Sequence, residues 1–177
     1  WRARAAEGHA FASHTYDHVY WRADAGTPQN PSFRVRPSAG GRKGQEFVMS
    51  APEYCAEIAH SAQRLQEITG QKPLPLFRAP GGKTSARLLH AARACGWAHV
   101  GWSPAGFLGD ELPSDKYPNA QLLSKALRDI RPGDILLAHL SIWDRKDPWA
   151  PADLEPLIVG LKERGFCFRT LREHPDY

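Results

Sequence analysis

The sequence of 177 residues has no apolar run that approaches the ~20 residues of a membrane span, so we expect no membrane-spanning helix. It also lacks a basic patch followed by an apolar stretch at its start, and no signal peptide is visible. The lack of a visible signal peptide slightly favours a cytoplasmic location for the protein. Because the chain opens with Trp1 rather than Met, its location is otherwise left open.

Long basic runs with interleaved aromatic residues are absent, and the formal net charge is only +4. A charge this small and diffuse predicts no nucleic-acid partner. Internal repeats and low-complexity tracts are absent as well, which argues against a repeat architecture.

Cysteine is scarce. Cys55, Cys95 and Cys167 lie far apart and form no Cys-x-x-Cys pair, so a cysteine zinc site is not expected. We expect all three to be buried packing residues, since an unpaired cysteine behaves as a small hydrophobic side chain.

The composition is that of a folded globular protein, with 42% hydrophobic and 24% charged residues. A chain of this length buries a sizeable core without a disulfide or metal staple. We therefore predict a single domain over residues 1–177.

Hydrophobic periodicity alternates between that of strands and that of helices. Four amphipathic helices are predicted, from a cap at Ser50 to a stop at Gly70, from a cap at Thr84 to Cys95, from a cap at Asn119 to Ile130, and between Pro151 and Gly165. Five strand-like stretches accompany them, at residues 10–13, 74–79, 97–103, 135–139 and 166–171. This alternation predicts an α/β fold with a mainly parallel sheet or barrel.

Residues 19–49 interrupt this pattern, because prolines and glycines are frequent there and predict irregular structure. The stretch is basic, with Arg22, Arg34, Arg36, Arg42 and Lys43. Two interpretations are open: a solvated surface excursion, or a loop over the site that contacts an anionic or polar substrate.

The pair His14 and His18 is the most informative feature. Two histidines four residues apart lie on one face if the segment is helical, and both can then reach one ion. Imidazole suits zinc, cobalt, nickel or iron, and Thr15 between the two would fix their orientation by hydrogen bonding within the loop. The alternative is a pair of surface histidines.

Three short motifs follow one another along the chain: His14-Thr15-x-x-His18, Arg78-x-Pro80 and Leu137-x-His139. In this order they resemble the polysaccharide deacetylase family, the NodB-homology domain also called carbohydrate esterase family four. The resemblance implies a distorted parallel βα barrel. It also implies a metal-dependent hydrolase that removes N-acetyl groups from an N-acetylated sugar or glycan. Hydrolysis of another C–N amide (a cyclic amide, imide or formamide) and a catalytically inactive carbohydrate-binding relative remain the alternatives.

The resemblance also implies roles for individual residues. His14 and His18 would hold a divalent metal, with zinc preferred over cobalt and nickel, and a metal-bound water would be the nucleophile. His139 would protonate the departing amine as general acid. Arg78 would orient the carboxylate that serves as base.

Four further residues would contact the substrate. By the same resemblance, Leu137 would line the pocket for the acetyl methyl group, and Pro80 would shape the loop that carries Arg78. Trp143 and Trp149 would form a wall on which a sugar ring stacks; packing of a loop is the alternative.

The chain departs from the family pattern in two places. Nothing before His14 resembles the family's first motif, which supplies the base and the third protein ligand of the metal, and five strands are predicted where the family barrel has seven. We therefore expect that an N-terminal segment containing the first two strands is missing from this sequence. Whether the protein forms a homo-oligomer is left open. The aspartates of the fourth motif are also absent at their places. Asp110 is a candidate to take over the polarisation of His139, and the alternative is that it is a loop carboxylate or a helix cap.

Overall fold

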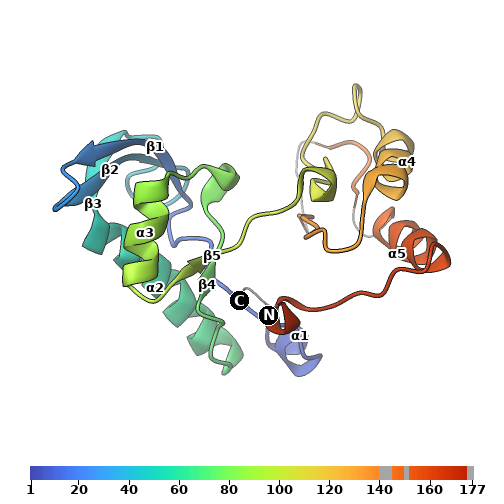
Figure 1. Cartoon of the computed structure of the whole chain (residues 1–177), viewed down its shortest axis with the longest axis horizontal. Coiled ribbons are helices and arrows are strands. Elements are labelled where there is room, and N and C mark those ends of the chain that lie inside the picture. The colour runs from blue at the N-terminus through green and yellow to red at the C-terminus, as the bar shows by residue number, and fades with distance from the viewer. Residues whose placement is uncertain (140–144, 150–151, 175–177) are drawn as a thin grey trace. The chain divides into compact units, whose positions relative to one another are not determined.

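The structure is a computed structural model that describes residues 1–139, 145–149 and 152–174. Its contacts divide the chain into two compact units, Trp1–Gly101 and Trp102–Asp176, and each is described by itself (Figure 1). The expected single domain stays a prediction. In the described part of the chain, no helix is long and apolar enough to cross a membrane.

The first unit contains three helices, α1 (Arg2–Ala6), α2 (Ala51–Thr69) and α3 (Ala86–Ala94). Helix α2 begins and ends as predicted. Ser50 and Glu53 form a capping box, in which the Glu53 carboxylate accepts from the Ser50 backbone N–H at 2.7 Å, and Gly70 ends the helix with a φ of 73°. Helix α3 is capped one residue later than predicted, because the side chain of Ser85 rather than Thr84 accepts from Leu88 N–H.

A small parallel sheet forms between β4 (Leu76–Phe77) and β5 (Ala98–His99). Ser13 adds an isolated parallel bridge to Phe77, so the predicted strand at residues 10–13 reduces to one bridging residue. The predicted strands at 74–79 and 97–103 reduce to two residues each. Residues that follow these strands leave the sheet at the same edge, because parallel strands share their carboxyl ends.

Residues 19–49 were expected to be irregular, and this expectation is wrong. They form most of a three-stranded antiparallel sheet in the order β1 (Val19–Gly26), β2 (Pro31–Pro37) and β3 (Phe47–Ser50). The prolines of β2 lie at its two ends, where a missing N–H disrupts the ladder least. Between them buried and exposed residues alternate, as a half-buried strand requires.

Helices α2 and α3 pack against each other and against β2. The shared core joins residues of the antiparallel sheet, the two helices and β4 and includes Val19, Phe33, Val35, Met49, Tyr54, Ile58, Phe77 and Leu88. It fixes the sheet to the helices from one side only, which leaves the alternate residues of β1 and β2 facing outward.

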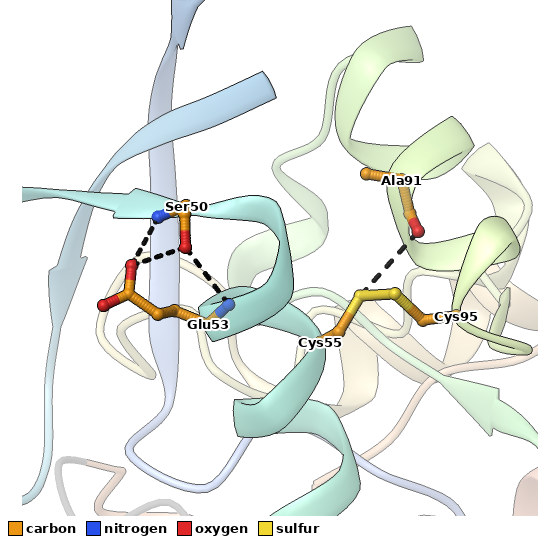
Figure 2. Close-up of a disulfide and its surroundings, with 5 residues drawn as sticks. All are labelled: Ser50, Glu53, Cys55, Ala91 and Cys95. Atoms are coloured by element: carbon orange, nitrogen blue, oxygen red, sulfur yellow. Dashed lines mark hydrogen bonds between the residues drawn. A yellow bond between two sulfur atoms is a disulfide. The ribbon is translucent and has the colours of Figure 1, made fainter. Parts of the chain in front are cut away.

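A disulfide between Cys55 and Cys95 links α2 to the end of α3, with the Cα atoms 6.3 Å apart (Figure 2). The expectation of three unpaired, buried cysteines is therefore wrong. Cys167 is exposed. The spacing of 40 residues between the bonded pair gives no local signal, so only the packing of the two helices reveals it.

The second unit contains α4 (Asn119–Asp129), α5 (Leu154–Glu163) and two short 3₁₀ turns, Pro104–Gly106 and Leu171–Glu173. Asn119 is the first helical residue of α4 rather than its cap, and its backbone N–H donates to the Asp147 carboxylate at 3.1 Å. The core of this unit joins apolar residues of both helices with Leu108, Ile130 and Trp149.

The strands predicted in the second unit do not form among the residues that the structure describes. Residues 135–139 contribute one parallel bridge, between Phe107 and Leu137, and residues 166–171 contain no strand. An extended segment becomes a strand only where a neighbour completes its hydrogen-bond ladder. The predicted α/β class is thus confirmed, while the distorted parallel βα barrel stays a prediction.

Candidate functional site

The loop that carries His14 and His18 is built by the hydroxyl groups of its neighbours rather than by a helix. Ser13 Oγ donates to the Ile58 carbonyl of α2 at 2.9 Å, and Thr15 Oγ1 accepts from Val19 N–H at 2.8 Å. The helical interpretation of the spacing is wrong, whereas the predicted hydrogen bond of Thr15 within the loop is confirmed.

Two residues of this loop adopt left-handed backbone conformations, Thr15 with a φ of 62° and His18 with a φ of 51°. A positive φ is unfavourable for a β-branched residue and persists only where surrounding contacts enforce it. The buried Thr15 side chain provides such contacts. The tight turn brings the two imidazoles together, with ring centroids 4.8 Å apart and ring planes inclined by 76°.

The hydrogen bonds of both rings fit metal binding. His14 Nδ1 lies 2.6 Å from the Arg78 carbonyl oxygen, which can only accept, so Nδ1 carries the proton and Nε2 carries the lone pair. His18 Nδ1 lies 2.5 Å from Ser38 Oγ, which is compatible with the same tautomer. Metal-binding imidazoles are usually oriented in this way by an oxygen on the opposite nitrogen. Among residues 1–139, 145–149 and 152–174, no group of three or more His, Cys, Asp or Glu side chains could hold a metal. The roles of His14 and His18 as metal ligands stay predictions.

The parallel sheet explains why Arg78 meets His14. Ser13 and Phe77 are bridged, so the residues that follow them emerge together at the carboxyl edge. Pro80, next along this segment, is buried in the 3₁₀ turn Pro80–Gly82. The action of the Arg78 side chain on a catalytic carboxylate stays a prediction.

Sequence reasoning missed Tyr20, which lies beside the pair. Its ring centroid is 5.0 Å from that of His18, with the planes nearly perpendicular at 87°. On its other side, a Cβ added to Gly81 would lie 2.8 Å from Tyr20 Cε1, so the ring occupies the space that a side chain there would need. Tyr20 lies on β1, the strand that follows the histidine loop, and the expectation of irregular structure for residues 19–49 concealed it.

In the second unit, Asp110 and His139 form a close pair. Asp110 Oδ1 lies 3.0 Å from His139 Nδ1, and Asp110 Oδ2 accepts the His139 backbone N–H. The Asp110 carboxylate is 1% exposed, whereas the His139 ring is 26% exposed. The pair thus joins a buried charge to a ring that reaches solvent. The structure brings together the two residues that the sequence linked, and their catalytic roles stay predictions.

The predicted aromatic wall does not form around Trp149. Its side chain is 2% exposed and belongs to the core of the second unit, so its ring faces are covered by protein and cannot stack on a sugar. Leu137 is also buried, at 5% exposure. Trp143 lies outside the described residues.

Comparison with known proteins identifies the class. The polysaccharide deacetylase family model matches residues 1–100, more than half of the sequence, and the chain belongs to this family. The predicted family is thus confirmed.

Among individual relatives, a chitooligosaccharide deacetylase of Azorhizobium caulinodans is 27% identical over 176 residues, covering 93% of this chain and 69% of the relative. A family 4 acetyl xylan esterase from Clostridium thermocellum, solved with a cobalt ion, is 28% identical with a TM-score of 0.59. That match covers 71% of this chain and 56% of the esterase, so the chain spans about half of that protein. A family 4 carbohydrate esterase from Streptomyces lividans, in complex with acetate, shares the fold with a TM-score of 0.64 at 19% identity and covers 96% of this chain.

Proposed function

We propose that this protein is a metal-dependent hydrolase that removes N-acetyl groups from an N-acetylated sugar or glycan. The observation that carries the proposal is the hydrogen bond between His14 Nδ1 and the Arg78 carbonyl, which joins two of the family's motifs and directs the lone pair of His14 to Nε2. Family membership and the likeness to a chitooligosaccharide deacetylase support the choice of substrate.

His14 and His18 would hold the metal through Nε2, and zinc is the preferred ion because borderline cations suit imidazole. When bound there, such an ion polarises the acetamide carbonyl and acidifies a water molecule. Ser38 and the Arg78 carbonyl would keep both rings oriented by holding their Nδ1 atoms.

His139 would donate the proton that the amine needs as it leaves. The buried Asp110 carboxylate fixes the ring through Nδ1 and stabilises the positive charge of the protonated imidazole. The proton would then be delivered from Nε2, at the other end of the ring.

The test combines zinc analysis with a deacetylation assay on a chitooligosaccharide. Zinc-loaded protein that includes the expected N-terminal segment, which would supply the base and the third metal ligand, is expected to bind one metal ion and release acetate, and His14→Ala and His18→Ala are expected to lose both properties. His90→Ala, which changes an exposed histidine of α3, is the matched control and should retain them. Binding of the oligosaccharide without acetate release, at full metal loading, would favour the inactive carbohydrate-binding alternative. Acetate release that persists in both histidine variants would overturn the metal assignment.

We further propose that the protein acts in an oxidising compartment rather than in the cytoplasm. The Cys55–Cys95 disulfide supports this location, because such bonds persist in oxidising surroundings and are rare in the cytosol. Alkylation of free thiols at the moment of cell lysis, followed by mass analysis, tests the proposal. Labelling of Cys167 alone is expected, and labelling of all three cysteines would contradict it.

A further inference from the structure

The second unit contains a small apolar cavity of about 90 Å³, lined by residues of helix α4 and of the segment before it. Leu122 and Ala126 line it from α4, and both side chains are buried. Residues four apart on a helix lie on one face, so α4 gives the cavity a continuous apolar wall. The buried Leu108 lines it from the preceding segment.

The backbone at Gly109, which also lines the cavity, approaches α4 closely. Gly109 has a φ of 75°, and a Cβ added there would lie 2.8 Å from Leu122 Cδ2, so a larger residue would displace the wall. The next residue is Asp110, whose carboxylate accepts the His139 backbone N–H. A ligand in the cavity would therefore lie against the segment that holds His139.

Two polar side chains, Tyr117 and Lys125, line the same cavity. Both are exposed, so their apolar parts cover the wall while the hydroxyl and the ammonium reach solvent at the mouth. Within the described part of the chain, neither polar group forms a hydrogen bond or an ion pair. The pKa of the nearby Asp129 is lowered mainly by its hydrogen bonds from the Arg128 side chain and less by the Lys125 charge. Lys125 is thus left to meet another anion.

The position of Tyr117 is fixed through its backbone. Its N–H donates to the Pro113 carbonyl at 2.9 Å, and its carbonyl accepts from the buried Arg145 guanidinium at 3.1 Å. A site whose walls are held in this way has little conformational freedom to lose when a ligand binds.

We infer that this cavity binds a short-chain aliphatic carboxylate, with the alkyl chain inside and the carboxylate at the mouth. An apolar cavity of about 150 Å³ holds a benzene ring, so one of about 90 Å³ suits an alkyl group of about three or four carbon atoms. The Lys125 ammonium supplies the opposite charge, and the Tyr117 hydroxyl can donate a hydrogen bond to the same group. Binding at this cavity is independent of the proposed deacetylation.

The test follows the backbone amide resonances of the chain by NMR while sodium pentanoate is added at neutral pH. Pentanoate is expected to bind in the millimolar range, because it is small, and to shift the amides of Gly109 and Leu122 most. Acetate, which lacks the longer alkyl chain, should bind at least roughly tenfold more weakly. Pentan-1-ol and pentylammonium should bind at least roughly threefold more weakly, since neither offers Lys125 a negative charge.

Variants separate the charge from the cavity. Lys125→Gln is expected to weaken pentanoate binding by at least roughly threefold and to leave pentan-1-ol binding unchanged. Ala105→Leu enlarges a side chain that lines the cavity and is expected to abolish the binding of both ligands. The matched controls, Lys162→Gln on α5 and Ala120→Leu on α4, change exposed residues outside the cavity lining and should bind both ligands as wild type does.

Four results would overturn the inference. The first is the absence of saturable shifts at Gly109 and Leu122, and the second is pentan-1-ol binding as tight as that of pentanoate. The third is wild-type affinity for pentanoate in Lys125→Gln, and the fourth is binding that persists in a folded Ala105→Leu variant. If the amide spectrum shows that Ala105→Leu does not fold, the comparison of wild type with Lys125→Gln decides.

Discussion

His14 and Arg78, 64 residues apart in the sequence, are joined by a hydrogen bond of 2.6 Å from an imidazole Nδ1 to a backbone carbonyl. The parallel bridge between Ser13 and Phe77 places both residues at one sheet edge. The orientation of a candidate metal ligand therefore depends on strand pairing rather than on the loop alone. A change that disturbs this pairing is expected to act on metal affinity without touching either histidine.

The contact between Asp110 and His139 predicts the effect of an isosteric change. In Asp110→Asn the amide keeps the shape of the carboxylate but cannot stabilise a protonated imidazole, so kcat is expected to fall by about a hundredfold or more with little change in KM. Steady-state deacetylation kinetics would measure it. Glu111→Gln alters an exposed carboxylate 3.9 Å from His139 Nε2 and should change kcat much less. An equal loss in both variants would contradict the specific role of Asp110.

The turn between the two histidines depends on the Thr15 hydroxyl. Thr15→Val keeps the shape but removes the acceptor of the buried Val19 N–H, and the free energy of unfolding is expected to fall by about 1–3 kcal/mol. Zinc affinity should fall with it, since the same turn positions His14 and His18. Thr15→Ser retains the hydroxyl and serves as the control in denaturant unfolding and zinc titration. Wild-type zinc affinity in Thr15→Val would show that the turn persists without this hydrogen bond.

The disulfide predicts a redox-dependent stability. It closes a loop of 40 residues, and its loss in a Cys55→Ser, Cys95→Ser double variant is expected to lower the free energy of unfolding by about 2–4 kcal/mol. Unfolding in urea, with and without a reductant, would measure this. Wild type should become reductant-sensitive, and the exposed Cys167→Ser variant should behave as wild type. A double variant as stable as the oxidised wild type would contradict the prediction.

The contacts of the buried Arg145 side chain predict that its position in the second unit requires arginine. Its guanidinium, which is 1% exposed, donates to the carbonyls of Leu112, Tyr117 and Asp147 and to the side chains of Asn119 and Asp147. Lysine cannot reproduce this planar set of donors, so Arg145→Lys is expected to destabilise the unit by about 3 kcal/mol or more. Hydrogen exchange of the α4 amides would detect it. The reciprocal Lys146→Arg change at the exposed neighbour should leave exchange unaltered.

The capping box of α2 predicts that the stability of the protein decreases at acidic pH. Hydrogen bonds from the Ser50 hydroxyl and backbone N–H lower the pKa of Glu53 below its usual value of 4.5 (Figure 2). Because the folded-state pKa is depressed, the stabilisation is complete above pH 4.5 and is lost as the pH falls through the folded-state pKa. Glu53→Gln should therefore lose less stability than wild type between neutral and acidic pH, as urea unfolding at both would show. Equal losses of stability in wild type and in Glu53→Gln would contradict this prediction.

Much of the local structure could be predicted from the sequence because it depends on neighbouring residues. The α2 helix, from its capping box at Ser50 to Gly70, needs only its own caps and apolar stripe. The antiparallel sheet was missed because the prolines and glycines of residues 19–49 indicate breaks equally well in a loop and at strand ends. The prediction of strands at 135–139 and 166–171 failed for a related reason, since an apolar stretch does not reveal whether a neighbour completes its ladder.

The candidate site could likewise be predicted from the sequence only in part. By itself the sequence determined the family and the motif residues, because the order of His14, Arg78 and His139 is independent of conformation. The tertiary structure alone decided how these residues are used: the positive φ values that bring His14 and His18 together, and the carbonyl that orients His14. It also placed Tyr20 beside His18 and paired Cys55 with Cys95. These relationships join residues distant in the chain, and they exist only once backbone pairing and packing have set the distances between them.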